Sequence, residues 1–346
     1  MQTLPLRNLG RSGVQLPIVG VGGAPLGDLH EIITEVEADA TLRTAWDSGL
    51  RYYDTAPWYG TGKSEHRVGR MLRTLPRDSY ILSTKAGRCL ERPRDLATYR
   101  PSRWVGGLPF EVRFDYTYSG MMRAYEDSLA RLGLNRVDLL LIHDIDTNHH
   151  ATREAVAARF VELVDGGGLR ALEELKRFGE IKAFGAGVNL RGTIRDCLDR
   201  FDLDFFLVAG PYTLLDQAIL DDEWPMLESR GCGVILGSVF ASGILAAPEG
   251  QNALYLTRPV PPHIADKLQA IRGIAKRHGV SLAAAAIQFG LANPRVTSIV
   301  PGVNHPDQVA MNLDLLETAI PADFWQELKS GNLLHPEAPV PTAAPC

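Results

Sequence analysis

The chain has 346 residues, a formal net charge of −5 and a sequence pI near 6.0. It has no basic surplus and no run of like charges, so we expect no nucleic-acid partner. No apolar run reaches the roughly 18 residues of a membrane helix and the N-terminus has no signal-peptide pattern, so we expect a soluble protein without a membrane partner. Four scattered cysteines without a C-x-x-C pair indicate no disulfide framework or zinc site, and they fit a reducing cytoplasm.

Residues 6–20 alternate in polarity around a turn-rich centre and predict a β-hairpin. After it, strand-like and helix-like segments alternate. Strands are predicted near Val19 and at 50–53, 79–84, 137–142, 181–187, 204–208, 233–237 and 296–300. Helices are predicted at 35–48, 64–73, 119–132, 168–178, 191–200, 216–230, 262–292 and 306–316. Eight such βα units predict an α/β fold, a closed parallel (β/α)8 TIM barrel that follows the hairpin.

We expect one domain over residues 1–346, because α/β barrels of this length occur as single units. The barrel is expected to span about 18–316, and 317–346 to form a C-terminal tail that is irregular at its end. Long insertions at 86–117 and 144–166 interrupt the regular spacing at the C-terminal face of the barrel. Loops of this length are usually functional or disordered.

Polar side chains stand directly after several predicted strands, at the end of a barrel where active sites lie. These are Asp54, Tyr59, Lys85 and His143. Each alone has an ordinary explanation, but together they suit acid–base chemistry. A tyrosine exchanges protons near neutral pH only if a cation lowers its pKa from ~10, and Lys85 can serve as that cation. Asp54 would keep Lys85 charged, while His143 can share the proton or orient the substrate oxygen.

The order and local context of these four residues resemble the aldo-keto reductase superfamily, whose catalytic tetrad is Asp, Tyr, Lys and His. The resemblance runs from about Leu6 to Leu315 and includes the stretches 49–56, 128–133 and 299–302. It implies a nicotinamide dinucleotide lying extended across the barrel mouth. A Rossmann unit is not supported, because no G-x-G-x-x-G element follows a strand.

The resemblance also places the cofactor on loops after the seventh and eighth predicted strands. The Gly- and Ser-rich stretch 237–245 matches the pyrophosphate loop of the family, whose backbone N–H groups and hydroxyls hold phosphate oxygens. The stretch 301–312 matches the loop at the adenosine end. The residues expected to contact the cofactor are Gly23, Asp54, Asn189, Ser238, Phe240, Ser242, Gly243, Leu245, Pro301, Gly302, Asn304, Gln308 and Asn312.

Departures from the family pattern indicate which dinucleotide is preferred. Relatives that prefer NADPH carry a Lys-Ser pair and an Arg around the 2′-phosphate, where this chain has Gly302-Val303 and Gln308. Each lost charge-assisted hydrogen bond is worth about 1.5 to 3 kcal/mol, so we expect NAD, with NADP less favoured. Asn189 can hold the carboxamide only if its turn is shifted by one residue.

Within the superfamily, the stretches 22–25, 114–116, 143–144, 185–189 and 210–217 resemble a narrower group. That group holds the L-fucose and D-threo-aldose 1-dehydrogenases and pyridoxal 4-dehydrogenase. It implies NAD-dependent oxidation of a sugar hemiacetal to its lactone, in which the tetrad tyrosine takes the hydroxyl proton. The alternatives are pyridoxal 4-dehydrogenase, an NADPH-dependent aldehyde or ketone reductase, and a non-catalytic nucleotide-binding regulatory or structural protein.

Aromatic residues are expected to form the substrate site, since their faces can stack on a sugar or on a pyridine ring. The residues expected to line it are Trp58, Trp104, Phe110 and His143. The insertion 86–117 is either an aromatic lid on this site or a self-packed surface loop. No metal is expected, because the adjacent His149 and His150 point apart in extended chain and no third ligand has motif spacing. The sequence carries no signal of oligomeric state.

Overall fold

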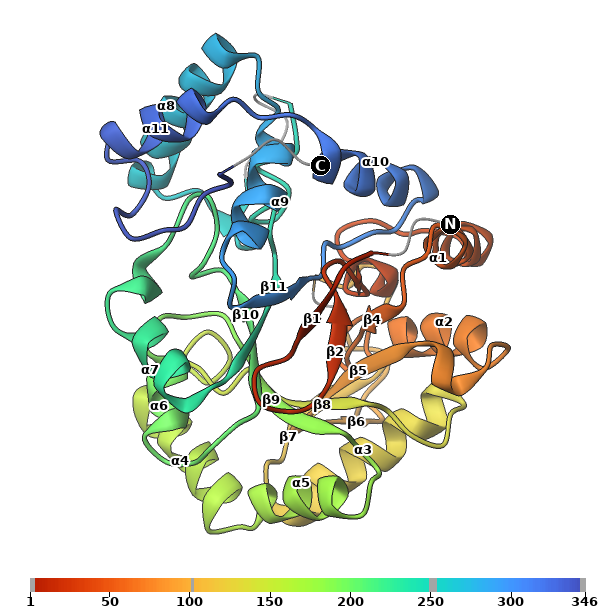
Figure 1. The fold of residues 1–346 in the computed structure, drawn as a ribbon. Coiled ribbons are helices and arrows are strands. Elements are labelled where there is room, and N and C mark those ends of the chain that lie inside the picture. Colours follow the sequence, from red (N-terminus) through yellow and green to blue (C-terminus); the bar gives the residue numbers. More distant parts are fainter. Residues whose placement is uncertain (1–3, 101–102, 249–253, 343–346) are drawn as a thin grey trace.

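Eight parallel strands form one sheet in the computed structural model, which describes residues 4–100, 103–248 and 254–342. In sheet order the strands are β14 (Val296–Ile299), β11 (Gly233–Gly237), β10 (Phe205–Ala209), β9 (Ala183–Val188), β8 (Leu139–His143), β5 (Ile81–Ala86), β4 (Tyr52–Asp54) and β3 (Val21–Gly22). The outermost strands meet, because Val19 bridges Ile299 and Gly22 bridges Gly302 in parallel. The sheet therefore closes on itself, and the predicted (β/α)8 barrel is confirmed (Figure 1).

Helices surround the sheet on its outside (Figure 1). They are α1 (Glu35–Asp47), α2 (Lys63–Leu72), α3 (Tyr118–Leu132), α4 (Arg153–Val164), α5 (Gly168–Arg177), α6 (Thr193–Leu198), α7 (Glu223–Arg230), α8 (Pro262–His278), α9 (Leu282–Ala292), α10 (Pro306–Glu317) and α11 (Ala322–Ser330). Several begin at a hydroxyl cap; Thr34 accepts a hydrogen bond from the Glu37 N–H and starts α1. Over the described ranges, no helix combines the length and the apolar character that crossing a membrane requires.

Side chains along the strands alternate between the barrel interior and the helices. In β8, Leu139 and Leu141 belong to an inner apolar cluster, whereas Leu140 and Ile142 pack in the larger cluster that includes the helices. The predicted N-terminal hairpin is present, with β1 (Leu6–Asn8) antiparallel to β2 (Gln15–Pro17). Leu16 of the hairpin joins the inner cluster, so the hairpin closes the barrel at the N-terminal ends of the strands.

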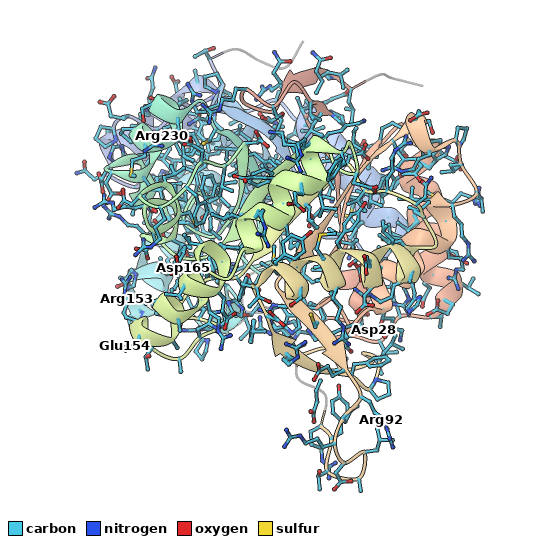
Figure 2. The ribbon with its side chains drawn as sticks, turned by 90° about the horizontal axis from the view of Figure 1, so that it is seen from below. Asp28, Arg92, Arg153, Glu154, Asp165 and Arg230 are labelled. Carbon is cyan, nitrogen blue, oxygen red and sulfur yellow. The ribbon has the colours of Figure 1, made fainter. Side chains whose placement is uncertain are left out.

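The two insertions contain more regular structure than the sequence predicted. The first forms an antiparallel hairpin of β6 (Arg88–Glu91) and β7 (Glu111–Phe114), whose connection carries Arg92 away from the body (Figure 2). The second contains α4, which starts where the Thr152 hydroxyl accepts from the Ala155 N–H. Helix α11 in the expected tail was also missed, and the described residues after it, 331–342, form no helix or strand as expected.

Smaller elements complete the chain. One predicted helix, 216–230, is shorter than expected: it is the 3-10 turn η3 (Ala218–Leu220) followed by α7, because Asp222 accepts from the Glu223 N–H and starts a new helix there. The remaining short elements are η1 (Pro25–Gly27), η2 (Arg77–Ser79), β12 (Leu254–Tyr255) and β13 (Arg258–Pro259).

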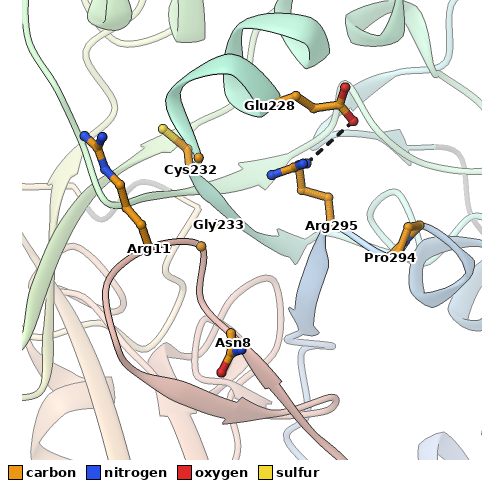
Figure 3. A pocket seen from close by; sticks show the side chains of 9 residues that line it. Asn8, Arg11, Glu228, Cys232, Gly233, Pro294 and Arg295 are labelled. Atoms are coloured by element: carbon orange, nitrogen blue, oxygen red, sulfur yellow. Dashed lines mark ion pairs between the residues drawn. The ribbon is translucent and has the colours of Figure 1, made fainter.

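A cleft of about 450 Å³ opens between the N-terminal hairpin and the starts of β11 and β14 (Figure 3). Its charged side chains already have partners: Arg295 lies 3.5 Å from Glu228, and Arg11 lies 3.9 Å from Asp202. This is the N-terminal end of the barrel, where residues mainly stabilise the fold. The predicted catalytic residues lie at the opposite end.

Candidate active site

Asp54 and Lys85 form a buried ion pair at the C-terminal ends of β4 and β5. Lys85 Nζ lies 2.8 Å from Asp54 Oδ2 and also donates to the Thr55 carbonyl oxygen at 2.8 Å. The Ser83 hydroxyl donates to Asp54 Oδ1 at 2.7 Å. Burial lowers the pKa of Lys85, but the Asp54 carboxylate outweighs it and the net shift is upward. Lys85 is therefore an ammonium at neutral pH, as the sequence predicted.

The half-buried Tyr59 lies beside this pair, with the centre of its ring 4.6 Å from Lys85 Nζ. Burial raises the pKa of Tyr59 to about 12, and the nearby Lys85 charge lowers it by less. The sequence predicted the direction of the lysine's contribution but not that burial would exceed it. Tyr59 is therefore a neutral phenol at pH 7, able to donate a hydrogen bond.

His143 ends β8, and the centre of its ring lies 6.0 Å from the centre of the Tyr59 ring. Its Nε2 lies 3.1 Å from Asp144 Oδ2, while its enclosed Nδ1 has no hydrogen-bond partner among the described residues. Burial lowers the pKa of His143 well below its usual value, although the Asp144 carboxylate opposes the shift. The imidazole is therefore neutral at pH 7.

Two tryptophans cover Tyr59. The rings of Trp58 and Trp104 meet edge-on at 5.4 Å, and Trp104 lies 5.6 Å from the Tyr59 ring. The Trp104 indole N–H is buried and has no partner in the described part of the chain. Phe110 also belongs to the predicted substrate set but is exposed, and no described ring contact joins it to these residues.

Backbone contacts hold Trp104 in place although it lies in the first insertion. Trp104 bridges Leu29, and the Lys63 ammonium donates to the Gly106 carbonyl oxygen at 2.8 Å. Lys63 is itself paired with the fully buried Asp28. This part of the insertion is thus packed against the site, as expected of an aromatic wall, while the segment around Arg92 projects away from the body (Figure 2).

A polar network beside His143 was not predicted from the sequence. Asp144 Oδ2 accepts from Arg88 Nη2 at 2.5 Å, and Asp144 Oδ1 accepts from Asn189 Nδ2 at 2.7 Å. Asn189 Nδ2 also lies 3.2 Å from Asp146 Oδ2. The only signal for it in the sequence is the adjacent pair His143-Asp144. The side-chain N–H of Asn189 is used by the Asp144 carboxylate. Its side-chain carbonyl oxygen is left for the predicted contact with the carboxamide of the nicotinamide.

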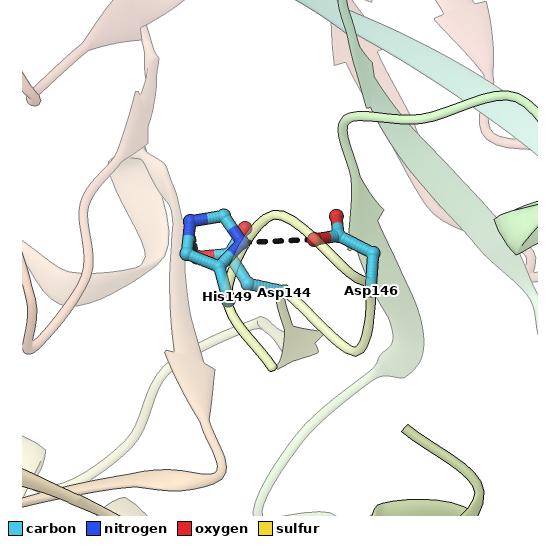
Figure 4. A group of neighbouring side chains, drawn as sticks. All are labelled: Asp144, Asp146 and His149. Atoms are coloured by element: carbon cyan, nitrogen blue, oxygen red, sulfur yellow. Dashed lines mark hydrogen bonds and ion pairs between the residues drawn. The ribbon is translucent and has the colours of Figure 1, made fainter. Parts of the chain in front are cut away.

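Asp144, Asp146 and His149 each offer a ligand atom within 4.8 Å of the others (Figure 4). His149 Nδ1 lies 3.0 Å from Asp146 Oδ1, and the guanidinium of Arg88 already neutralises Asp144. A divalent cation would have to displace that arginine. The group is therefore arranged as a hydrogen-bond network, and the expectation of no metal stays a prediction.

The predicted pyrophosphate loop follows β11 and has an unusual backbone. Ser238, Ala241, Ser242 and Gly243 all have positive φ, at 51°, 48°, 63° and 87°. Turns of this kind aim successive N–H groups into a concavity that suits an anion. Leu245 is buried in the core, so only its backbone could reach a cofactor. The remaining predicted member, Phe240, is half-buried beside the loop.

One further cation reaches this loop from the first insertion. The Arg103 guanidinium donates to Thr257 Oγ1 at 2.9 Å, and the Thr257 N–H donates to Ser242 Oγ at 2.7 Å. The guanidinium carbon of Arg103 also lies 5.0 Å from the centre of the Trp58 ring. This contact joins residues 154 positions apart and has no signal in the sequence.

Glycines are required where the barrel closes. A Cβ on Gly23 would lie 2.6 Å from the Asp54 carbonyl oxygen, and a Cβ on Gly302 would lie 2.8 Å from Pro25 Cγ. Pro301 accepts from the Gly22 N–H at 2.9 Å in the same region. Side chains at these positions would meet neighbouring atoms, so the lysine found at the Gly302 position in NADPH-preferring relatives would not fit without rearrangement.

The predicted adenosine end lies at the start of α10. Gln308 Oε1 accepts from the Asn304 N–H at 2.8 Å, so the glutamine that replaces an arginine caps the helix. Asn304 Nδ2 donates to the carboxylate of Glu31 at 3.1 Å. Asn312 is buried one turn further along α10. Glu31 was not singled out in the sequence, because it is 273 residues from Asn304.

The residues present fit an extended dinucleotide. A loop with positive φ angles suits a pyrophosphate, glycines permit close approach, and a tyrosine lies next to a charged lysine. A closed parallel barrel with this group at its strand ends has the layout of an oxidoreductase that works with a bound nicotinamide cofactor.

Comparison with known proteins identifies the family. Residues 18–332 match the Aldo/keto reductase family, and the chain belongs to it. It is 42% identical over 336 residues to pyridoxal 4-dehydrogenase of Microbacterium luteolum, covering 95% of this chain and 97% of that protein. It is 38% identical over 334 residues to D-threo-aldose 1-dehydrogenase of a Pseudomonas species, covering 93% and 96%.

A solved structure agrees with the fold. The holo form of an aldo-keto reductase from Bacillus halodurans superposes with a TM-score of 0.72 at 24% identity over 99% of both chains. The predicted family and the prediction of an enzyme are thus confirmed: the protein is an oxidoreductase that acts on small molecules with a nicotinamide cofactor, NAD(P)(H). The cytoplasmic location remains a prediction.

Proposed function

We propose that the protein is an NAD-dependent dehydrogenase that oxidises a sugar hemiacetal, of the L-fucose or D-threo-aldose type, to its lactone. The observation that carries the proposal is the Tyr59 phenol, which lies beside the charged Lys85, with the ring centres of Trp104 and His143 at 5.6 Å and 6.0 Å from its own. A phenol next to an ammonium can exchange a proton with a substrate hydroxyl. The 38% identity to a D-threo-aldose 1-dehydrogenase supports the same substrate class.

The tetrad residues would act on the oxygen of the hydroxyl being oxidised. A bound nicotinamide supplies a hydride acceptor. In its phenolate form Tyr59 would take the hydroxyl proton as the C–H bond breaks, and the adjacent Lys85 ammonium favours that form. Asp54 keeps Lys85 charged and in place. Trp58 and Trp104 would keep water from this region.

Pyridoxal is the second candidate substrate, favoured by the 42% identity to pyridoxal 4-dehydrogenase. Its hemiacetal presents the same reacting group on an aromatic ring, which can stack against the indoles. Purified protein should be mixed with NAD or NADP and, separately, with L-fucose, D-arabinose, L-galactose and pyridoxal. We expect NADH to form, followed by its absorbance, with at least one sugar. If none of the four compounds is oxidised, and NADPH is consumed with simple aldehydes, the protein is a general aldehyde reductase and the proposal is wrong.

A preference for NAD is supported by a carboxylate at the adenosine end. Asn304 and His305 belong to the loop where NADPH-preferring relatives bind the 2′-phosphate. The Glu31 carboxylate accepts a hydrogen bond from Asn304 Nδ2, and its Oε1 lies 3.6 Å from His305 Nε2. A carboxylate there suits the 2′-hydroxyl of NAD as an acceptor and repels the phosphate of NADP. Gln308 caps α10 and is neutral, so it supplies no positive charge to balance a 2′-phosphate.

Changing Glu31 to glutamine is expected to reduce the preference for NAD. We predict that kcat/KM with NADP rises about tenfold, while kcat/KM with NAD changes by less than about threefold. Steady-state kinetics with both cofactors measures this. The matched control is Asp323→Asn, which removes a surface carboxylate on α11. An unchanged NAD to NADP ratio in Glu31→Gln would exclude this carboxylate from cofactor selection.

A further inference from the structure

The peptide group between His143 and Asp144 is held from both sides at the end of β8. Asp144 has a left-handed backbone, with φ at 56°, which is uncommon for a residue with a side chain and persists only where the surroundings stabilise it. The Asp144 N–H donates to the Gly187 carbonyl oxygen at 3.3 Å. On the other side of the same peptide group, the Tyr116 hydroxyl donates to the His143 carbonyl oxygen at 2.6 Å. Tyr116 therefore fixes the backbone that carries the His143 side chain.

Tyr116 lies between the ends of the strands that carry Lys85 and His143. It is fully buried, although it follows β7 at the end of the first insertion. A Cβ on Gly87 would lie 2.3 Å from Tyr116 Cε1, so the tyrosine ring packs directly on the backbone two residues after Lys85. Its hydroxyl reaches the last residue of β8, which is the neighbouring strand of β5. The tyrosine thus connects the two strand ends.

The second insertion holds the same tyrosine. The Tyr116 N–H donates to Glu162 Oε2 on α4 at 3.1 Å, and His150 Nε2 lies 3.2 Å from the Tyr116 hydroxyl oxygen. A phenol has one hydrogen, which goes to the His143 carbonyl oxygen, so the hydroxyl oxygen accepts from His150. The Phe114 ring packs edge-on against His150, with the ring centres 4.4 Å apart. Both insertions therefore meet at the backbone of His143.

We propose that Tyr116 is a positioning residue for His143. Its hydroxyl holds the His143 carbonyl oxygen, and this contact keeps the imidazole in place beside Tyr59, with the two ring centres 6.0 Å apart. Tyr116 acts through His143, since its own hydroxyl is occupied by the carbonyl oxygen and by His150. This inference rests on the proposed place of His143 in the active site. It does not depend on which substrate is oxidised.

A small movement of this peptide group is expected to change the rate of turnover. Reacting groups must be held within about 0.5 Å of the productive geometry, and a misplacement of about 1 Å can lower a rate about 100-fold. The Asp144 side chain is fixed separately, by Arg88 at 2.5 Å and by Asn189 at 2.7 Å. Loss of the Tyr116 contact is therefore expected to act mainly on His143.

Tyr116→Phe removes the hydroxyl and keeps the ring that packs on Gly87, so the variant is expected to fold. We expect kcat to fall about tenfold and the KM for the dinucleotide to change less than about twofold, because most of the residues predicted to bind it follow β11 and β14. Rates are measured with whichever of the four compounds is oxidised, or with a simple aldehyde and NADPH if none is.

The matched control is Tyr125→Phe. It removes a buried hydroxyl that donates to Glu180 Oε2 at 3.1 Å, just before the N-terminal end of β9, and it should leave kcat unchanged. A kcat within about twofold of wild type in Tyr116→Phe would overturn the proposal.

A double-mutant cycle separates positioning from a general structural effect. In His143→Ala there is no imidazole to position, so adding Tyr116→Phe should change the remaining kcat by less than about twofold. A second loss of about tenfold in that background would mean that Tyr116 acts without His143, and the proposal would be wrong.

A crystal structure of Tyr116→Phe tests the inference without turnover. We expect the His143 imidazole to be displaced by more than about 0.5 Å from its place in wild-type crystals, or to occupy more than one conformer. An imidazole that superposes on that of the wild type would contradict the proposal. If the imidazole is displaced but the wild type oxidises none of the sugars or pyridoxal, the proposed function fails and the positioning role stands.

Discussion

Tyr59→Phe is expected to lower kcat for NAD-dependent oxidation by about 1000-fold while the affinity for NADH changes by less than about twofold. The Tyr59 ring lies beside the charged Lys85, and phenylalanine removes the hydroxyl while keeping the ring that packs on Trp104. Initial rates give kcat, and fluorescence titration gives the NADH affinity.

The matched control is Tyr80→Phe. The Tyr80 hydroxyl is buried without a hydrogen-bond partner in the described residues, so its removal should leave kcat unchanged. If Tyr59→Phe retains more than about a tenth of wild-type kcat, Tyr59 does not contact the reacting oxygen in the way proposed.

Asp54→Asn is expected to lower the free energy of unfolding by about 3 to 5 kcal/mol and to reduce turnover severely. The Lys85 and Asp54 side chains are 2% and 4% exposed, so removing the carboxylate charge leaves a buried ammonium without its counter-ion. Chemical denaturation measures the stability. The double variant Asp54→Asn with Lys85→Met should recover much of the lost stability, since no buried charge remains, but it should stay inactive.

Asp202→Asn provides the comparison at the surface. Asp202 lies 2.7 Å from Arg230, but the two side chains are 59% and 46% exposed, so we expect a change of no more than about 1 kcal/mol. If Asp54→Asn lowers the free energy of unfolding no more than Asp202→Asn does, the buried pair of Asp54 and Lys85 does not stabilise the protein as proposed.

The barrel and the tetrad were predictable from the sequence for one physical reason. Parallel strands in a closed barrel end at the same face, so polar residues directly after short apolar runs must meet there. To predict that Asp54 and Lys85 meet, it was enough to identify where their two strands end. The two strands are neighbours in the sheet. Helices α4 and α11 were missed because they lie in segments read as an insertion and a tail.

Other features depend on properties that residue order does not display. Asp144 pairs with His143 and has a left-handed backbone, and Glu31 meets Asn304 only because the barrel closes. The pKa of Tyr59 was predicted from its charged neighbour, but the extent of burial decides its direction. Contacts between distant residues and the extent of burial are known only from the folded structure.

The most direct test of the central claim is carbon-13 NMR of a reaction containing NAD and L-fucose labelled at its anomeric carbon. A hemiacetal dehydrogenase should produce a lactone carbonyl signal in step with NADH, with the open-chain acid appearing only afterwards by hydrolysis. Appearance of the acid without a preceding lactone would contradict oxidation of the cyclic form. Absence of both products and of NADH, repeated with the other sugars, would contradict the assignment of a sugar substrate.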